Sequence, residues 1–147
     1  MKVISDILLL ALLPLAAVAA TAGTDPVPVP LSAESQPEAL LYEKRVLVVF
    51  ADTERDPAFA RQMALLARDP AALDLRDIVV LVDTDPATRS AWRQKLRPRG
   101  FSLVLVDKDG SVALRKPLPW DVREITHVID RTPQGRQELL ARPEAGG

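Results

Sequence analysis

The stretch RVLVVF (Arg45–Phe50), followed by ADTERDP (Ala51–Pro57), decides the fold of this chain. Residues 46–50 are all apolar and mostly β-branched or aromatic, which is typical of a strand buried on both faces. Asp56 and Pro57 then indicate a helix start, with the aspartate as N-cap and the proline at the first helical position. A strand that passes through a polar turn into a capped helix places that turn at the carboxyl edge of a sheet, where open α/β folds keep their chemistry.

Three more segments indicate strands. Residues 78–82 and 102–106 are continuous apolar runs, and 111–115 alternates apolar with small or polar residues, as an edge strand with one wet face does. Asp107-Lys108-Asp109-Gly110 lies between the last two segments and predicts a four-residue hairpin turn. The sequence therefore predicts four strands, of which the last two are antiparallel.

Helical spacing of apolar residues and local capping signals predict the helices. The first helix is expected over 57–68, with Arg61, Gln62 and Arg68 on its exposed side, and a short helical turn follows at 71–75. Asp83-Thr84-Asp85-Pro86 repeats the acidic turn and the capped start, which predicts one helix from Pro86 to about Leu96. Asp121 is expected to cap a last helix, which ends near residue 132.

The element order is β-α-β-α-β-β-α, which predicts an α/β protein with a mixed four-stranded sheet. We expect two parallel βαβ crossovers, both right-handed, and an antiparallel edge made by the hairpin. This order is that of the thioredoxin core. The expected fold is therefore a thioredoxin-like three-layer α/β/α sandwich.

The first residues have the pattern of a secretory signal peptide. Lys2 precedes an apolar run of about 14 residues, shorter than the ~20 that a membrane-spanning helix needs, and small residues follow at 17–22. The predicted organisation is a signal peptide at 1–22, a Pro-rich linker at 23–38, a thioredoxin-like domain at 39–140 and a flexible tail at 141–147. This predicts a periplasmic or secreted protein with no stable transmembrane segment after cleavage.

Composition excludes several classes of function. The chain has 147 residues and no cysteine, so its own side chains cannot carry out thiol–disulfide chemistry, form disulfides or bind a metal through thiolates. The formal net charge of −1 gives no overall basic field for nucleic acid. We expect no cofactor and no nucleic-acid partner.

A set of short motifs spread over about a hundred residues gives the chain a family resemblance. The motifs are Tyr42-Glu43-Lys44-Arg45, Val46–Phe50, Asp56-Pro57, Lys108-Asp109-Gly110, Arg115, Pro119-Trp120, Ile129-Asp130, Pro133 and Glu138. In this order the chain resembles a family of bacterial exported thioredoxin-like domains of unknown function. A relative of that domain closes certain secreted proteins built from sushi repeats. The tail departs from the family pattern, because residues 132–136 lack its methionines and one of its arginines.

The resemblance implies the fold and no established activity. A thioredoxin enzyme needs a low-pKa cysteine at the start of its first helix, because the thiolate is the attacking species. In this chain that place falls within Asp52–Asp56. Thioredoxins also have a cis-proline just before the third strand, where this chain has Gly100-Phe101. Both hallmarks of the enzyme are missing.

The acidic turns are the first candidate site. Asp52, Glu54 and Asp56 follow one strand, and Asp83 and Asp85 follow the next, so both groups are expected at the same sheet edge. If they converge, they could support acid–base chemistry or an oxygen-ligated cation. The simpler interpretation is a pair of capped, solvated turns. The alternative function is therefore a thiol-independent enzyme, hydrolytic or cation-dependent, that uses these turns.

Four other features favour structural roles. Asp107-x-Asp109-Gly110 begins like a calcium loop but lacks its later ligands, so a hairpin turn is expected. His127 is the only histidine and is predicted to be exposed. Trp92 is expected in the core, and Trp120 as a cover over the last helix.

Arginines give the best indication of a binding surface. Arg89, Arg93 and Arg97 recur every four residues, with no acid between Pro86 and Gly100, which predicts one basic helix face. Such a face could meet an envelope protein or another anionic partner. The leading hypothesis is a non-catalytic, exported binding module of the cell envelope. The residues expected to form its surface are Arg89, Arg93, Arg97, Asp52, Arg55 and Arg115.

Overall fold

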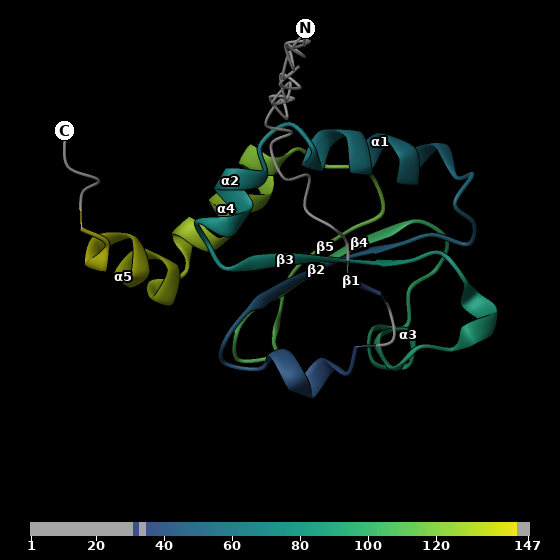
Figure 1. Ribbon diagram of the computed structural model, residues 1–147, viewed down its shortest axis with the longest axis horizontal. Helices are drawn as coiled ribbons and strands as arrows, with labels where there is room; N and C mark the ends of the chain where they lie inside the picture. Colours follow the sequence, from purple (N-terminus) through teal and green to yellow (C-terminus); the bar gives the residue numbers. More distant parts are fainter. Residues whose placement is uncertain (1–30, 33–34, 144–147) are drawn as a thin grey trace, which may run out of the picture.

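The computed structural model describes residues 31–32 and 35–143, and these form a mixed sheet covered by helices on both faces (Figure 1). The sheet contains β1 (Leu31–Ser32), β2 (Arg45–Phe50), β3 (Ile78–Asp83), β4 (Ser102–Val106) and β5 (Val112–Lys116), in the order β1-β3-β2-β4-β5. The four strands expected from the sequence are present. The strand β1, two residues long, adds a fifth at the outer edge of β3, inside the predicted Pro-rich linker.

Helices form the two outer layers of the sandwich. Figure 1 shows α1 (Pro57–Leu66), α2 (Pro70–Asp74) and α4 (Val122–Arg131) above the sheet, and α3 (Ala91–Leu96) with the 3₁₀ helix η1 (Pro37–Leu40) below it. A hydrophobic core lies on each face of the sheet, and alternate residues of β2 belong to one core or the other. Leu47 and Val49 pack toward α1, α2 and α4, whereas Val48 and Phe50 pack toward α3. The predicted three-layer α/β/α arrangement is confirmed.

The central strand explains why the sequence stretch 45–50 decides the fold. Every residue of β2 is buried, and β2 pairs with β3 on one side and with β4 on the other. Fully buried apolar side chains on both faces of one strand require a layer above and a layer below. At ~25 cal/mol per Å² of apolar surface, the burial of each Val or Leu contributes about 1.5–3 kcal/mol.

The expected second parallel crossover is wrong. The strands β2 and β3 are parallel, but β4 runs antiparallel to β2, with Phe50 opposite Ser102. The connection from β3 contains the three-residue 3₁₀ helix η2 (Pro86–Thr88) and the six-residue helix α3, which is about 9 Å long at 1.5 Å per residue. A strand of six residues spans about 20 Å. The connection does not carry the chain back to the amino edge, so β4 starts at the edge where β3 ends.

The prediction of a single helix over 86–96 is also wrong. The segment divides into the 3₁₀ helix η2 (Pro86–Thr88) and α3, because Arg89 adopts a left-handed backbone with φ 48°. Ser90 then acts as the N-cap of α3, and its hydroxyl accepts a hydrogen bond from the Arg93 backbone at 3.1 Å. A serine that can cap a new helix competes locally with continuation of the old one.

A further helix, which the sequence did not predict, follows α4. The helix α5 (Pro133–Ala141) begins after Thr132, whose hydroxyl accepts from the Gly135 backbone. Figure 1 shows α5 at one end of the molecule, beyond the sheet. The predicted signal peptide at 1–22 and residues 144–147 of the predicted tail lie outside the described residues. In the part of the chain that the structure describes, no helix is long and apolar enough to cross a membrane.

Candidate functional site

The predicted acidic turn after β2 is exposed. Asp52, Thr53, Glu54 and Arg55 are all accessible to solvent, and Asp56 is the N-cap of α1, accepting from the Ala58 backbone at 2.8 Å. In the neighbouring turn Asp85 likewise caps η2, through the Ala87 backbone at 3.0 Å. The side-chain hydrogen bond from Thr88 is the largest cause that lowers the pKa of Asp85. Both turns are therefore capped starts, as the simpler interpretation held.

The fifth carboxylate, that of Asp83, is committed to structure. Its side chain is 2% exposed and accepts a hydrogen bond at 2.8 Å from Nε of Arg93 and another from the Ser90 hydroxyl. Arg93 also donates to the backbone oxygen of Ala51 at 2.6 Å, which ties the end of β2 to the end of β3. Among the described residues no group of three or more His, Cys, Asp or Glu side chains is placed to hold a metal. This geometry gives no support to an enzyme built on the acidic turns.

The arginines do not form the single helical face that was expected. The Arg93 side chain is 10% exposed, stacks 5.4 Å from the ring centre of Phe50 and faces the sheet. Arg89 and Arg97 are exposed, but each has a left-handed backbone at a helix end, so the two project from opposite ends of α3. Arg93 is thus a structural residue, and the exposed positive charge is arranged around α3 rather than along it.

Five exposed cations surround this helix, and we call them the α3 basic surface: Arg89, Lys95, Arg97, Arg99 and Arg115. No carboxylate of the described residues forms an ion pair with any of them. Arg55, in the turn after β2, is exposed and likewise has no carboxylate partner in the described part of the chain.

A groove of about 380 Å³ lies at one end of the α3 basic surface. It is lined by Arg97, Arg99, Phe101, Ser102, Arg115 and Pro117. Because Ser102 pairs with Phe50, the groove lies at the carboxyl edge of β2, the edge where the sequence predicted the site. A second, more open groove of about 680 Å³ lies on the other side of α3, where Arg89 and Lys95 face Gln36 and Glu38.

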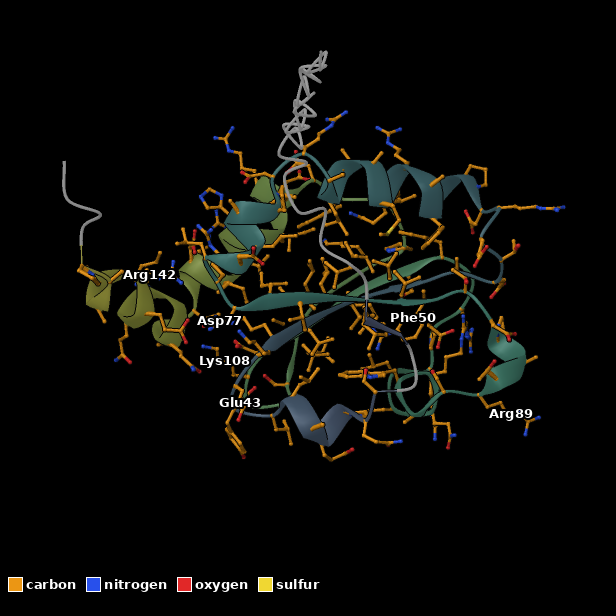
Figure 2. All side chains as sticks on the ribbon, in the orientation of Figure 1. Glu43, Phe50, Asp77, Arg89, Lys108 and Arg142 are labelled. Atoms are coloured by element: carbon orange, nitrogen blue, oxygen red, sulfur yellow. The ribbon has the colours of Figure 1, made fainter. Side chains whose placement is uncertain are left out.

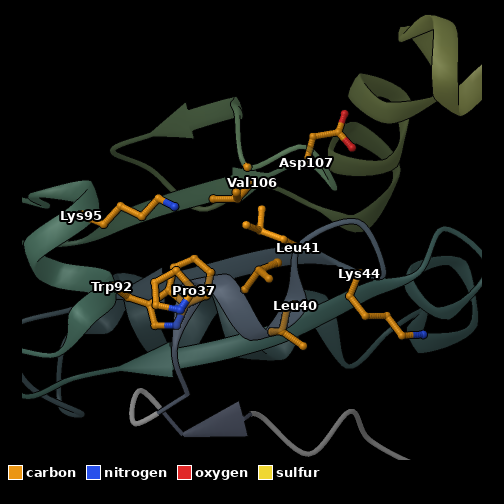
Figure 3. A pocket seen from close by; sticks show the side chains of 10 residues that line it. Pro37, Leu40, Leu41, Lys44, Trp92, Lys95, Val106 and Asp107 are labelled. Carbon is orange, nitrogen blue, oxygen red and sulfur yellow. The ribbon is translucent and has the colours of Figure 1, made fainter.

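A third cavity, between η1 and α3, is too small for an organic ligand. Its volume of about 10 Å³ fits roughly one water molecule. Figure 3 shows Pro37, Leu40 and Trp92 among the side chains around it. Trp92 is 1% exposed, which confirms its predicted place in the core, and its indole Nε1 has no hydrogen-bond partner among the described residues. This cavity is a packing feature of the core.

The opposite, amino edge of the sheet carries a buried network of charges that the sequence interpretation missed. Arg45 is 0% exposed, and its guanidinium donates at 2.8 Å to Asp107 and at 2.8 Å to Glu138 of α5. Lys108 bridges Glu138 at 3.0 Å and Asp77 at 2.9 Å. Figure 2 shows Asp77 and Lys108 at one end of the sheet, away from Phe50 and Arg89.

In this network the pKa values of Glu138, Asp77 and Lys108 move toward the charged forms. Burial on its own would raise the pKa of Glu138, but hydrogen bonds from Arg45 and Lys108 outweigh it and lower the value. The hydrogen bond from Lys108 lowers the pKa of Asp77. Burial would depress the pKa of Lys108, yet Asp77 and Glu138 raise it. These three groups are therefore held charged at neutral pH, which suits a structural tie rather than proton transfer.

Several motifs quoted for the family resemblance meet in this network. Arg45, Lys108 and Glu138 belong to three of these motifs. Arg76, which donates to the backbone of α2, forms an ion pair at 2.7 Å with Asp130 of a fourth motif. A signal was present in the sequence, since an arginine is unusual as the first residue of a buried strand. Its partners, 62 and 93 residues away, could not be identified from spacing alone.

The remaining sequence predictions can be placed as well. His127 is exposed, and Asp107 to Gly110 form the hairpin turn, with Gly110 donating to the Asp107 backbone at 2.9 Å. Trp120 packs partly buried on the core that contains α4. The expected exposure of Gln62 is wrong: it is 0% exposed, because its amide pairs with both the N–H and the C=O of Trp120, at 2.9 and 2.8 Å.

Comparison with solved structures confirms the thioredoxin-like fold. The reduced form of 2-Cys peroxiredoxin from Plasmodium vivax superimposes with a TM-score of 0.54 over 68% of this chain and 83% of that chain. Sequence identity is 15%, so this likeness concerns the fold alone. This chain has no cysteine with which to carry out the chemistry of a thiol peroxidase.

Comparison of sequences gives the family. The chain is 30% identical over 128 residues to the sushi repeat-containing protein SRPX of Rattus norvegicus, covering 71% of this chain. It spans only 26% of the length of that relative. The family model described as "Domain of unknown function (DUF4174)" matches residues 38–138, from η1 to the glutamate of the charged network. The chain therefore belongs to the DUF4174 family of domains of unknown function.

Proposed function

We propose that the chain is a non-catalytic binding module that recognises an anionic partner through the α3 basic surface. The observation that carries this proposal is a cluster of five exposed cations around one short helix, none of them paired with a carboxylate of the described residues. Unpaired like charges repel one another, so a cluster of this kind lowers the stability of the free protein slightly and favours contact with negative charge.

The distribution of charge supports a local site rather than general attraction. The whole chain carries a formal net charge of −1, so the surplus of positive charge at α3 is balanced elsewhere. At the amino edge the charges are neutralised in pairs, as in Arg45 with Glu138 and Arg76 with Asp130. Complementary charge at a local patch chiefly accelerates encounter and selects the partner.

The carboxyl edge of β2 also supports a role without thiol chemistry. The turn Asp52–Asp56 occupies the place where a thioredoxin enzyme has its cysteine, and its acids are exposed or act as caps. Arg55 of this turn extends the candidate surface. The signal-like sequence at 1–22 supports a role in the periplasm or outside the cell, and the proposed partner is an envelope protein or another acidic macromolecule.

Charge reversal tests the proposed function. The full chain with Arg89→Glu and Arg97→Glu is compared with a matched double variant, Arg61→Glu and Arg68→Glu, which changes the same charge on exposed positions of the α1 layer. After chemical cross-linking in the native compartment, the wild type and the matched control should give the same cross-linked partner, and the α3 variant should lose it. If the α3 variant retains that partner, the α3 basic surface is not the binding site.

A further inference from the structure

We propose that the groove lined by Arg97, Arg99 and Arg115 binds a tetrahedral oxyanion, such as a phosphoryl or sulfuryl group. We call it the arginine groove. This inference rests on the proposed function, because it names the chemical group by which an anionic partner would be recognised. It goes further in assigning a defined site to one part of the α3 basic surface.

Topology brings the three guanidinium groups together from separate segments. Arg97 ends α3, Arg99 lies in the loop before β4, and Arg115 comes from β5. The antiparallel pairing of β4 with β5 sets Val104 opposite Arg115, so the loop before β4 and the end of β5 meet at one corner of the sheet. Three cations converge on a space of about 380 Å³, which is within the usual size range of small-molecule sites.

One arginine of the groove is held in place. Arg115 donates one terminal nitrogen, Nη2, at 2.8 Å to the backbone oxygen of Leu96, at the end of α3. Its other guanidinium donors make no hydrogen bond to the described residues and remain available to a ligand. An arginine positioned by the protein loses less side-chain freedom when it binds, which favours affinity.

The composition of the lining favours a multiply charged oxyanion over a single carboxylate. The groove is lined by three arginines, Phe101, Ser102 and Pro117, and no acid is among them. A planar guanidinium donates two parallel hydrogen bonds to phosphate or sulfate oxygens, and three such groups can surround one tetrahedral centre. A dianion would offset more of the mutual repulsion of three cations than a monoanion would. Phe101 and Pro117 provide an apolar wall for the molecule that carries the anion.

Titration of the full chain by NMR tests this inference directly. Inorganic phosphate and sulfate should give saturable shifts of the backbone amides at 97–102 and 115–117, and acetate at the same ionic strength should bind at least tenfold more weakly. The variant Arg97→Gln with Arg115→Gln should weaken phosphate binding at least tenfold. The matched variant Arg61→Gln with Arg68→Gln should bind like the wild type, and thermal unfolding checks that both variants are folded.

A second arm of the experiment distinguishes the source of the anion. Vesicles of phosphatidylcholine with and without phosphatidic acid present a phosphomonoester, which can carry two negative charges, on a lipid surface. Binding that depends on phosphatidic acid and on Arg97 and Arg115 assigns the site to a lipid headgroup, whereas binding of inorganic phosphate without vesicle binding assigns it to a free or small-molecule anion.

Two results would overturn the inference: equal affinity for acetate and phosphate, or no saturable binding of phosphate, sulfate or vesicles. Its failure can be told apart from failure of the proposed function. Loss of the cross-linked partner in the Arg89→Glu, Arg97→Glu variant without any oxyanion binding would support the basic surface alone. Oxyanion binding with the cross-linked partner retained would support the arginine groove alone.

Discussion

Arg45 is a buried charged residue whose desolvation cost must be offset by its hydrogen-bond partners. As the first residue of β2 it shares the strand face of Leu47 and Val49, and so its side chain lies among the buried residues. Burial of a guanidinium carries a desolvation cost of several kcal/mol, which close partners must offset. Asp107, Glu138 and the backbone oxygen of Arg76 accept three hydrogen bonds from the guanidinium, and among the described residues Nη2 has no partner.

Replacement of Arg45 by Met should destabilise the protein by about 3–5 kcal/mol, although Met fills a similar volume. The reason is that Asp107 and Glu138 would keep their charges in a partly buried place with one cation fewer. Urea unfolding followed by far-ultraviolet circular dichroism measures the change. The control Arg61→Met, on the exposed side of α1, should alter stability by no more than about 0.5 kcal/mol. An Arg45→Met protein as stable as the control would show that the network contributes nothing.

At the residue scale, the sequence predicts what depends on near neighbours. The caps Asp56, Asp85 and Asp121 were all predicted correctly, because a cap bonds a backbone N–H two or three residues away. The burial of Gln62 and Arg45 could not be predicted in this way. Each is buried only because its partner, 58 or 93 residues distant, is brought to it by the fold.

At the scale of elements, the apolar runs in the sequence predicted the strands well. The spacing of residues along the expected helices did not predict where a helix breaks. Strands 45–50 and 102–106 are buried throughout and strand 78–83 is buried or half-buried, so their uninterrupted apolar runs identify them. The basic face expected from Arg89, Arg93 and Arg97 assumed an unbroken helix, and the Ser90 cap breaks it. The candidate site therefore lies at the predicted sheet edge. Its geometry depends on whether Ser90 continues one helix or caps a new one, and the four-residue spacing of the arginines does not decide this.

The helix α5 is held to the domain mainly by charge, which leads to a prediction for Glu138. The apolar side chains Leu139 and Leu140 of this helix are 37% and 87% exposed, whereas Glu138 contacts both Arg45 and Lys108. Glu138→Gln would remove the negative charge from two charge-assisted hydrogen bonds, each contributing about 1.5–3 kcal/mol, and would leave one oxygen instead of two to accept from Arg45 and Lys108. The helix should then open more often.

Hydrogen exchange measured by mass spectrometry checks this expectation. Amides of 136–141 should exchange at least tenfold faster in Glu138→Gln than in the wild type, while those of α4 should change little. Glu54→Gln, in the exposed turn after β2, serves as the matched control. Equal protection of α5 in all three proteins would mean that packing, and not the ionic contact, holds this helix.

At the scale of the whole molecule, the two ends of the sheet have different roles. The amino edge carries all the ion pairs of the described residues except Asp83 with Arg93, and these pairs join β2, the hairpin, α2, α4 and α5. The carboxyl edge carries Arg97, Arg99 and Arg115 exposed around a groove. Because the arginines of the groove are exposed and form no ion pair with the described residues, they can be changed with little effect on folding.

This arrangement predicts a loss of stability in acid. The carboxylates of Asp77, Glu138 and Asp130 have pKa values lowered in the folded protein, and the hydrogen bond from Arg76 is the largest cause for Asp130. Unfolded Asp and Glu titrate near pKa ~3.9 and ~4.3. When the folded value is the lower one, the unfolded chain takes up protons first as pH falls. The contribution to stability is therefore fully present above about pH 5 and is lost as pH falls through the folded pKa values, below about 4.

Urea unfolding from pH 7 down to about pH 2.5 tests this dependence, with the sign fixed by the direction of the shifts. The free energy of unfolding should fall steeply below about pH 4 in the wild type. In Glu138→Gln it should start lower at pH 7 and fall less steeply, since one of the titrating carboxylates has been removed. Glu54→Gln should follow the wild-type curve. Parallel curves for wild type and Glu138→Gln would show that acid acts on other groups, and that the charged network at the amino edge is not what links this fold to pH.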